Sequence, residues 1–145
     1  MKCSDEGIAA IAKREGGYVL TAYPDPATGG EPWTIGAGRA HGVKEGDTCT
    51  EEQARQWLKD DVGIAEKCIN NSVRVALLQN QFDALVSLVL NIGCGNFGTS
   101  LLLKKLNDGD DTGAAQQFHW WRMANGKVMA GLEKRRQEEM EQFLA

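Results

Sequence analysis

The sequence predicts an α+β fold in a single domain spanning residues 1–145, with an N-terminal helix, a small antiparallel β-sheet subdomain and a larger helical lobe. Three observations predict this order: apolar residues at helical spacing before residue 15, short β-favouring runs with proline and glycine over about 17–50, and helical patterns in the remainder. A chain of 145 residues with 42% hydrophobic residues holds one core and is too short for two ordinary domains. We expect an active-site cleft between the two lobes.

The first helix is predicted over residues 5–15. Ser4 is a favourable N-cap, and the acidic residues that follow it suit the positive end of the helix dipole. Ile8, Ile11 and Glu15 share one face because they recur at helical spacing. The glycine pair beginning at Gly16 ends the helix directly after Glu15.

The segment after this helix predicts a small sheet built on a hairpin. Runs 19–23 and 33–37 favour strands, and the turn residues of 24–30 separate them. Gly36 and Gly38, within or beside the second run, indicate a close approach of the backbone by a ligand or by another segment.

The helical lobe is predicted in several pieces. Thr50 and Gln53 form a capping-box pattern, so a helix should begin there and run to about residue 69, weakened at Gly63. Residues 79–92 are apolar nearly all round, which is typical of a central buried helix. The remainder is helical in pattern, with breaks expected at 95–98, 107–113 and 125–131.

Composition argues against several classes of partner. A net charge of −4 gives no electrostatic footprint for nucleic acid. The most apolar segment, 82–92, is well short of the roughly 20 residues that a membrane span needs. The first residues do not have the pattern of a signal peptide, so we expect a soluble protein without an export signal.

Four cysteines allow several disulfide pairings, of which one is excluded by the predicted helix. Cys49 and Cys68 would lie at its two ends, about 28 Å apart at 1.5 Å per residue, whereas a disulfide needs Cα atoms within about 7 Å. We expect free thiols, as in a reducing cytosol. No metal site or cofactor is expected, because the cysteines are scattered and His41 and His119 have no neighbours at ligand spacing.

Three residues have the chemistry that glycoside hydrolysis requires, which is a general acid and a second group that activates water or attacks the sugar. Glu15 lies at a helix end on the apolar face, where partial burial suits a general acid, although such residues are usually solvated. Asp25 lies in a turn where a carboxylate can face Glu15, or serves only as a turn former. Thr34 can orient a water molecule or simply favour the strand.

Taken together, the three residues and their surroundings resemble the active-site pattern of phage-type lysozymes. The resemblance covers nearly the whole chain: REGG at 14–17, LTAYPD at 20–25, PWTIGAG at 32–38, NQFDAL at 80–85, LNIG at 90–93, and GKV, GL and RR followed by Glu139 within 126–139.

The resemblance implies a lysozyme-like fold and roles for five residues. Glu15 would be the general acid, Asp25 the carboxylate that holds or activates water, and Thr34 its positioning partner, while Asn91 and Gly36 would bind substrate. The implied activity is that of an endolysin, which hydrolyses the β-1,4 bond between N-acetylmuramic acid and N-acetylglucosamine in bacterial peptidoglycan, with inversion. It further implies a monomer without cofactor that waits in the host cytoplasm until lysis and then acts on the cell wall.

Two departures from the family pattern bear on the site. The spacing from Glu15 to Asp25 is one residue longer than the common pattern, so either the intervening chain bulges or Asp25 is placed differently. Gly38 is followed by Arg39, with His41 two positions further on, where the family usually has a Gly-His pair. The longer spacing motivates one alternative, a non-catalytic lysozyme-like module that binds glycan, and an interaction or inhibitor protein of the same fold is another.

The aromatic residues of the helical lobe are interpreted as structural. Phe118, Trp120 and Trp121 are predicted to lie in the core, although aromatic rings also stack on sugars at carbohydrate sites.

Overall fold

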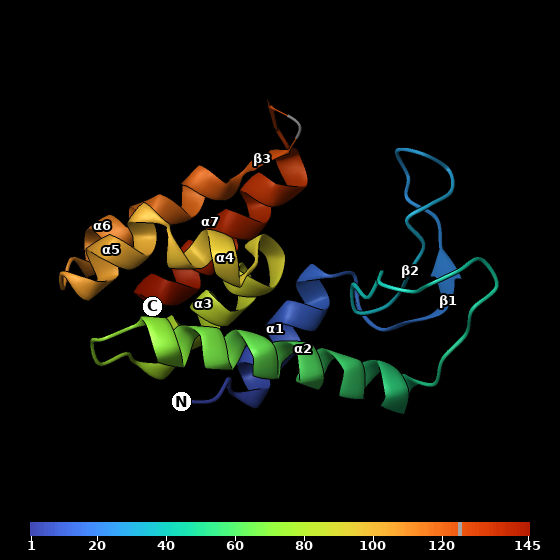
Figure 1. Cartoon of the computed structure of the whole chain (residues 1–145), viewed down its shortest axis with the longest axis horizontal. Helices are drawn as coiled ribbons and strands as arrows, with labels where there is room; N and C mark the ends of the chain where they lie inside the picture. Colours follow the sequence, from blue (N-terminus) through green and yellow to red (C-terminus); the bar gives the residue numbers. More distant parts are fainter. Residues whose placement is uncertain (125) are drawn as a thin grey trace. The chain divides into compact units, whose positions relative to one another are not determined.

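The computed structural model describes residues 1–124 and 126–145, and the chain divides into two compact units. One unit comprises residues 8–61, and the other comprises 1–7 with 62–145. The first contains the small sheet and the second contains most of the helices, in the element order that the sequence predicts (Figure 1). Within the described residues, no helix combines the length and the apolar character needed to cross a membrane.

Helix α1 (Asp5–Arg14) begins and ends for the reasons that the sequence indicates. The Ser4 hydroxyl accepts a hydrogen bond of 3.0 Å from the backbone N–H of Gly7, which satisfies one of the free donors of the first turn. The Glu15 N–H donates to the Ile11 carbonyl at 3.0 Å, so Glu15 still belongs to the last turn. Gly16 then takes a φ of +91°, which stops the helix.

The small sheet consists of β1 (Val19–Tyr23) and β2 (Thr34–Gly36), which pair antiparallel. Val19 lies opposite Gly36 and Tyr23 lies opposite Thr34, so four residue steps of β1 face only two of β2. The surplus residues of β1 pair with segment 47–49 instead, through hydrogen bonds from Cys49 N–H to the Leu20 carbonyl (3.0 Å) and from Ala22 N–H to the Asp47 carbonyl (2.9 Å). β1 therefore has a register shift between Val19 and Tyr23, which is compatible with the first of the two alternatives that the longer spacing left open, a bulge between Glu15 and Asp25.

Helix α2 (Glu51–Ser72) begins at the predicted cap, where the Thr50 hydroxyl accepts a hydrogen bond of 3.1 Å from the Gln53 N–H. It runs three residues beyond the predicted end at 69, and Gly63 does not interrupt it. Since buried residues such as Leu58 and Ile69 anchor the helix by packing, one unfavourable glycine does not break it.

Helix α3 (Gln79–Ile92) coincides with the predicted central helix, and all residues from 81 to 89 are buried. Helix α7 (Ala130–Leu144) packs along it. The remaining elements of this unit are α4 (Cys94–Gly98), α5 (Leu101–Asn107), α6 (Asp111–Gln116), the 3₁₀ helix η1 (Gln117–Trp121), and the strands β3 (Met123–Ala124) and β4 (Lys127–Val128).

In this unit, the structure differs from the sequence prediction at all three predicted helix breaks. Residues 95–98 form part of α4, because a single helical turn tolerates glycine when Phe97 is fully buried beneath it. The break at 107–113 shrinks to the short gap between α5 and α6, where Asp110 caps α6 by accepting from the Gly113 N–H at 2.9 Å. The break at 125–131 contains β4 and the start of α7, and residue 125 lies outside the described residues.

The expectation of four free thiols is wrong, because Cys68 and Cys94 form a disulfide with Cα atoms 6.0 Å apart. Packing of α2 beside the turn that follows α3 brings them within the distance a disulfide requires, which no local pattern shows. Cys3 and Cys49 are not disulfide-bonded, and the predicted absence of a Cys49–Cys68 bond is confirmed.

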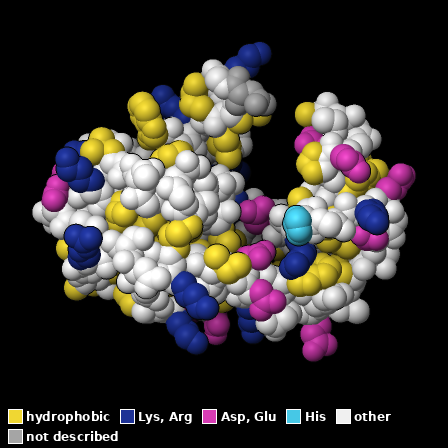
Figure 2. Space-filling model, in the orientation of Figure 1, with side chains coloured by type: hydrophobic (Ala, Val, Ile, Leu, Met, Phe, Trp, Pro, Cys, Tyr) yellow, Lys and Arg dark blue, Asp and Glu magenta, His cyan; other side chains and the backbone are white. Residues whose placement is uncertain are grey.

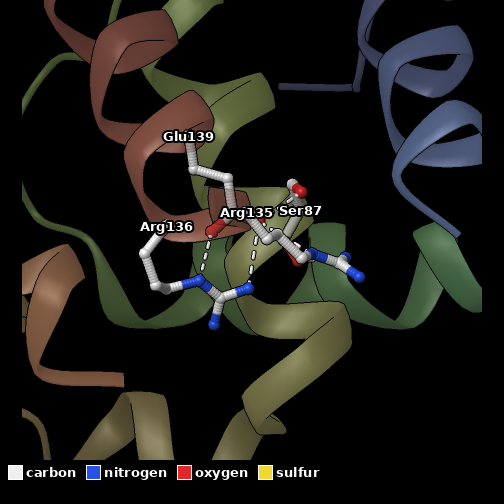
Figure 3. A network of polar contacts seen from close by, with 4 residues as sticks. All are labelled: Ser87, Arg135, Arg136 and Glu139. Atoms are coloured by element: carbon white, nitrogen blue, oxygen red, sulfur yellow. Dashed lines mark hydrogen bonds and ion pairs between the residues drawn. The ribbon is translucent and has the colours of Figure 1, made fainter. Parts of the chain in front are cut away.

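A buried ionic network joins α7 to α3 (Figure 3). Glu139 and Arg136 are both fully buried, with 2.7 Å between Arg136 Nε and Glu139 Oε1. Arg135 Nε donates to Glu139 Oε2 at 3.2 Å, and the Ser87 hydroxyl of α3 donates to the same oxygen. This network accounts for the RR and Glu139 of the sequence as a structural element rather than a site.

Candidate active site

Glu15 is half-buried at the end of α1, as predicted. Its carboxyl group lies against Gly38, since a Cβ built on that glycine would come 2.5 Å from Glu15 Oε2 and 2.9 Å from Cδ. Gly38 belongs to the turn after β2, which is closed by paired hydrogen bonds between Ile35 and Arg39 of 2.8 and 3.0 Å. The helix end and this turn together fix the position of the carboxyl group.

Asp25 follows β1 by two residues and is held by its own loop. Its carboxylate oxygen Oδ1 accepts a hydrogen bond of 2.7 Å from the Ala27 N–H, which makes an Asx turn. Its backbone N–H donates to the Gly30 carbonyl at 3.0 Å, and its carbonyl accepts from Gly29 at 2.8 Å. Asp25 is half-buried, so the loop holds its carboxylate in a defined place rather than leaving it in free solution.

Thr34 is the first residue of β2, and its partner across the sheet is Tyr23, the last residue of β1. Asp25 and Thr34 therefore flank the same end of the strand pair. Glu15, Asp25 and Thr34 all belong to the unit of residues 8–61, which therefore includes the first helix as well as the predicted small lobe of about 17–50.

The two residues assigned to substrate binding have different surroundings. Gly36 is buried, and a Cβ placed there would lie 3.4 Å from the Trp57 ring and 3.5 Å from Ala54 Cβ, so the close approach that its sequence position indicates is made by α2. Asn91 is exposed near the end of α3, in the other unit. Their roles in binding stay predictions.

Comparison with known proteins places this arrangement in a family. The family model described as phage lysozyme matches residues 13–139, which include all five predicted site residues. The chain belongs to the phage lysozyme family. It is accordingly a glycoside hydrolase of the endolysin kind, and peptidoglycan of the bacterial cell wall is what such enzymes act on.

Individual relatives cover this lysozyme almost end to end. The endolysin of Acyrthosiphon pisum secondary endosymbiont phage 1 is 44% identical, over 99% of this chain and 98% of the relative. The endolysin of Salmonella phage P22 is 41% identical, over 100% of this chain and 99% of the relative. Among solved structures, the endolysin from Escherichia coli O157:H7 phage FAHEc1 has a TM-score of 0.88 at 39% identity, covering 99% of this chain and 94% of that one.

A contact beside the candidate site supports the turn that contains Gly38. The guanidinium of Arg39, next to Gly38, lies over the Trp57 ring at 4.8 Å from its centroid, which anchors the turn against α2. Burial raises the pKa of nearby Asp61, while the charge of Arg39 lowers it and that of Asp60 raises it further. In the sequence, the only indication of the contact between Arg39 and Trp57 is the departure from the usual Gly-His pair, in which Arg39 replaces the histidine.

Proposed function

We propose that this lysozyme cleaves the β-1,4 bond between N-acetylmuramic acid and N-acetylglucosamine. Glu15 donates its proton to the glycosidic oxygen as the bond to the sugar carbon breaks. Asp25 accepts a proton from the water that attacks that carbon, and the hydroxyl of Thr34 helps to orient the water. The departing sugar leaves with the proton of Glu15, and the hydroxyl group on the cleaved sugar carbon comes from the water molecule.

The observation that carries this proposal is the contact between the Glu15 carboxyl group and Gly38. This contact supports the proposal, because it brings the candidate acid against the turn after β2, in the same compact unit as Asp25 and Thr34 at the far end of the sheet. A carboxylate used merely for solubility needs no such contact. The register shift in β1 supports the proposal further, because extra chain between Glu15 and Asp25 can be accommodated within the strand.

We further propose that the reaction inverts the anomeric configuration, since the roles given to Asp25 and Thr34 are those of a water-activating pair rather than of a nucleophile. Proton NMR of the reducing end formed in the first minutes of reaction tests this. The α anomer is expected first, and initial formation of the β anomer would indicate a retaining route with a covalent intermediate.

The oligomeric state and the cellular location of the enzyme are proposed from its membership of the endolysins. We propose that it works as a monomer and reaches the wall from the host cytoplasm once another protein has opened the membrane.

Release of reducing ends from purified, peptide-bearing sacculi is the experiment that tests the activity. The wild-type chain should release muramic acid reducing ends with no added metal. Binding to sacculi without release would instead support the non-catalytic glycan-binding alternative.

A further inference from the structure

The turn after β2 lies against the carboxyl group of Glu15. Gly38 of this turn is exposed, and a Cβ on it would come 2.5 Å from Glu15 Oε2. Backbone hydrogen bonds of 2.8 and 3.0 Å between Ile35 and Arg39 close the turn and join it to β2. These bonds fix the shape of the turn, whereas its position against the neighbouring helix depends on side chains.

A cavity of about 250 Å³ lies beside this turn, within the unit of residues 8–61. Its lining includes Ile35 and Arg39 at the base of the turn, together with the polar side chains of His41 and Asp47. Figure 2 shows a histidine side chain next to basic and acidic ones on the surface of this unit. Because protein interiors are normally close-packed, open space here means that packing alone does not hold the turn.

The side chain of Arg39 connects the turn to α2. Its guanidinium group lies 4.8 Å from the centroid of the Trp57 ring, which is within the range of a cation–π interaction. Asp61 follows Trp57 by four residues, so the two lie on the same face of α2. Burial raises the pKa of the Asp61 carboxyl group and the charge of Arg39 lowers it, so the two groups are close enough to attract each other. Arg39 thus has two attachments to α2, one to a ring and one to a charge.

We infer that Arg39 is a positioning residue for Glu15. It ties the turn to α2 through the Trp57 ring, and the same turn meets the Glu15 carboxyl group through Gly38. Buried residues such as Leu58 anchor α2, so the helix is a firm support for the turn. The inference rests on the proposed function, because the position of this carboxyl group matters for the rate only if it transfers a proton. The role given to Arg39 involves no contact with the substrate.

Removal of the Arg39 side chain tests this role in the full-length enzyme. Arg39→Ala should lower kcat for reducing-end release from sacculi by about tenfold, less than the roughly 10²-fold of a displacement of about 1 Å, because the backbone bonds of the turn remain. KM should stay unchanged, since a misplaced acid weakens only the transition state. Arg39→Lys should recover most of the loss, because an ammonium group can also lie over the Trp57 ring. The matched control is Arg55→Ala, which should keep both constants, because Arg55 lies over the Tyr18 ring at 4.6 Å in the same unit but outside the turn.

A double variant separates positioning from a general loss of stability. Arg39→Ala combined with Gly38→Ala should lower kcat by less than the product of the two single effects, because both changes act through the position of one carboxyl group. Losses that multiply fully, with every variant folded at the assay temperature, would overturn the inference. So would an unchanged kcat in Arg39→Ala, or a raised KM at constant kcat, which would identify Arg39 as a substrate-binding residue. Failure of the proposed function would look different, because Glu15→Gln would then release reducing ends at nearly the wild-type rate, or the wild-type chain would release none.

Discussion

Replacing Gly38 with alanine perturbs the proposed acid without touching it chemically. The new Cβ would come 2.5 Å from Glu15 Oε2, whereas ordinary contact begins near 3.4 Å, so the carboxyl group must move by about 0.9 Å. Misplacement of a reacting group by about 1 Å lowers rates by about 10²-fold. Gly38 also has a φ of +85°, and alanine in that region costs about 1–2 kcal/mol of stability.

Gly42→Ala is the matched control for this effect. Gly42 has a φ of +73° in the same unit, and a Cβ there would meet nothing within 4 Å. Both variants should therefore lose similar stability in thermal melts, while only Gly38→Ala should lose about 10²-fold in kcat for reducing-end release from sacculi. Equal kcat values for the two variants, with both folded at the assay temperature, would refute the claim that Gly38 positions Glu15.

Three further predictions concern the second carboxylate, the disulfide and the buried network. Asp25→Asn should lower reducing-end release by about 10²-fold or more, because water loses its base, whereas Asp5→Asn at the exposed start of α1 should leave the rate unchanged. Cys68→Ser should lower the free energy of unfolding by about 3.5 kcal/mol in urea titrations, the chain-entropy value for a separation of 26 residues. Glu139→Gln should cost about 3–5 kcal/mol in the same titrations, because it leaves buried guanidinium groups uncompensated.

Each of these has an outcome that would contradict it. A near wild-type rate for Asp25→Asn would mean that another carboxylate acts, and Glu31 of the same loop would be tested next. Labelling of four thiols in denaturant without prior reduction would show that the disulfide is absent. A loss of stability in Glu133→Gln, an exposed position of α7, as large as that in Glu139→Gln would show that burial of the ion pair is not the cause.

Elements with strong local signals were predicted correctly from the sequence. The capping pattern at Thr50 located the start of α2, and the pattern of 79–92, apolar nearly all round, located α3 to the residue. Glu15 was located at its helix end because its spacing from Ile11 and the glycines after it are both local features. Helical periodicity and end signals depend on neighbours within one or two turns, so sequence alone carries them.

Features that depend on tertiary packing were not predictable in this way. The Cys68–Cys94 bond needs α2 and the end of α3 to lie together, which no spacing records. The sequence left open whether a ligand or another segment approaches Gly36, and only the packing of α2 answers it. Trp120 was assigned to the core as an aromatic residue of the helical lobe, but it is 75% exposed, and the 3₁₀ turn that separates it from buried Phe118 has no clear sequence signal.

Loss of the proton at Glu15 tests the central claim most directly. Glu15→Gln has nearly the same shape, so the variant should keep the melting temperature of the wild type while release of reducing ends from sacculi falls by at least about 10²–10⁴-fold, the usual contribution of general acid catalysis. A folded Glu15→Gln variant that releases reducing ends within tenfold of the wild-type rate would contradict the assignment of Glu15 as the acid.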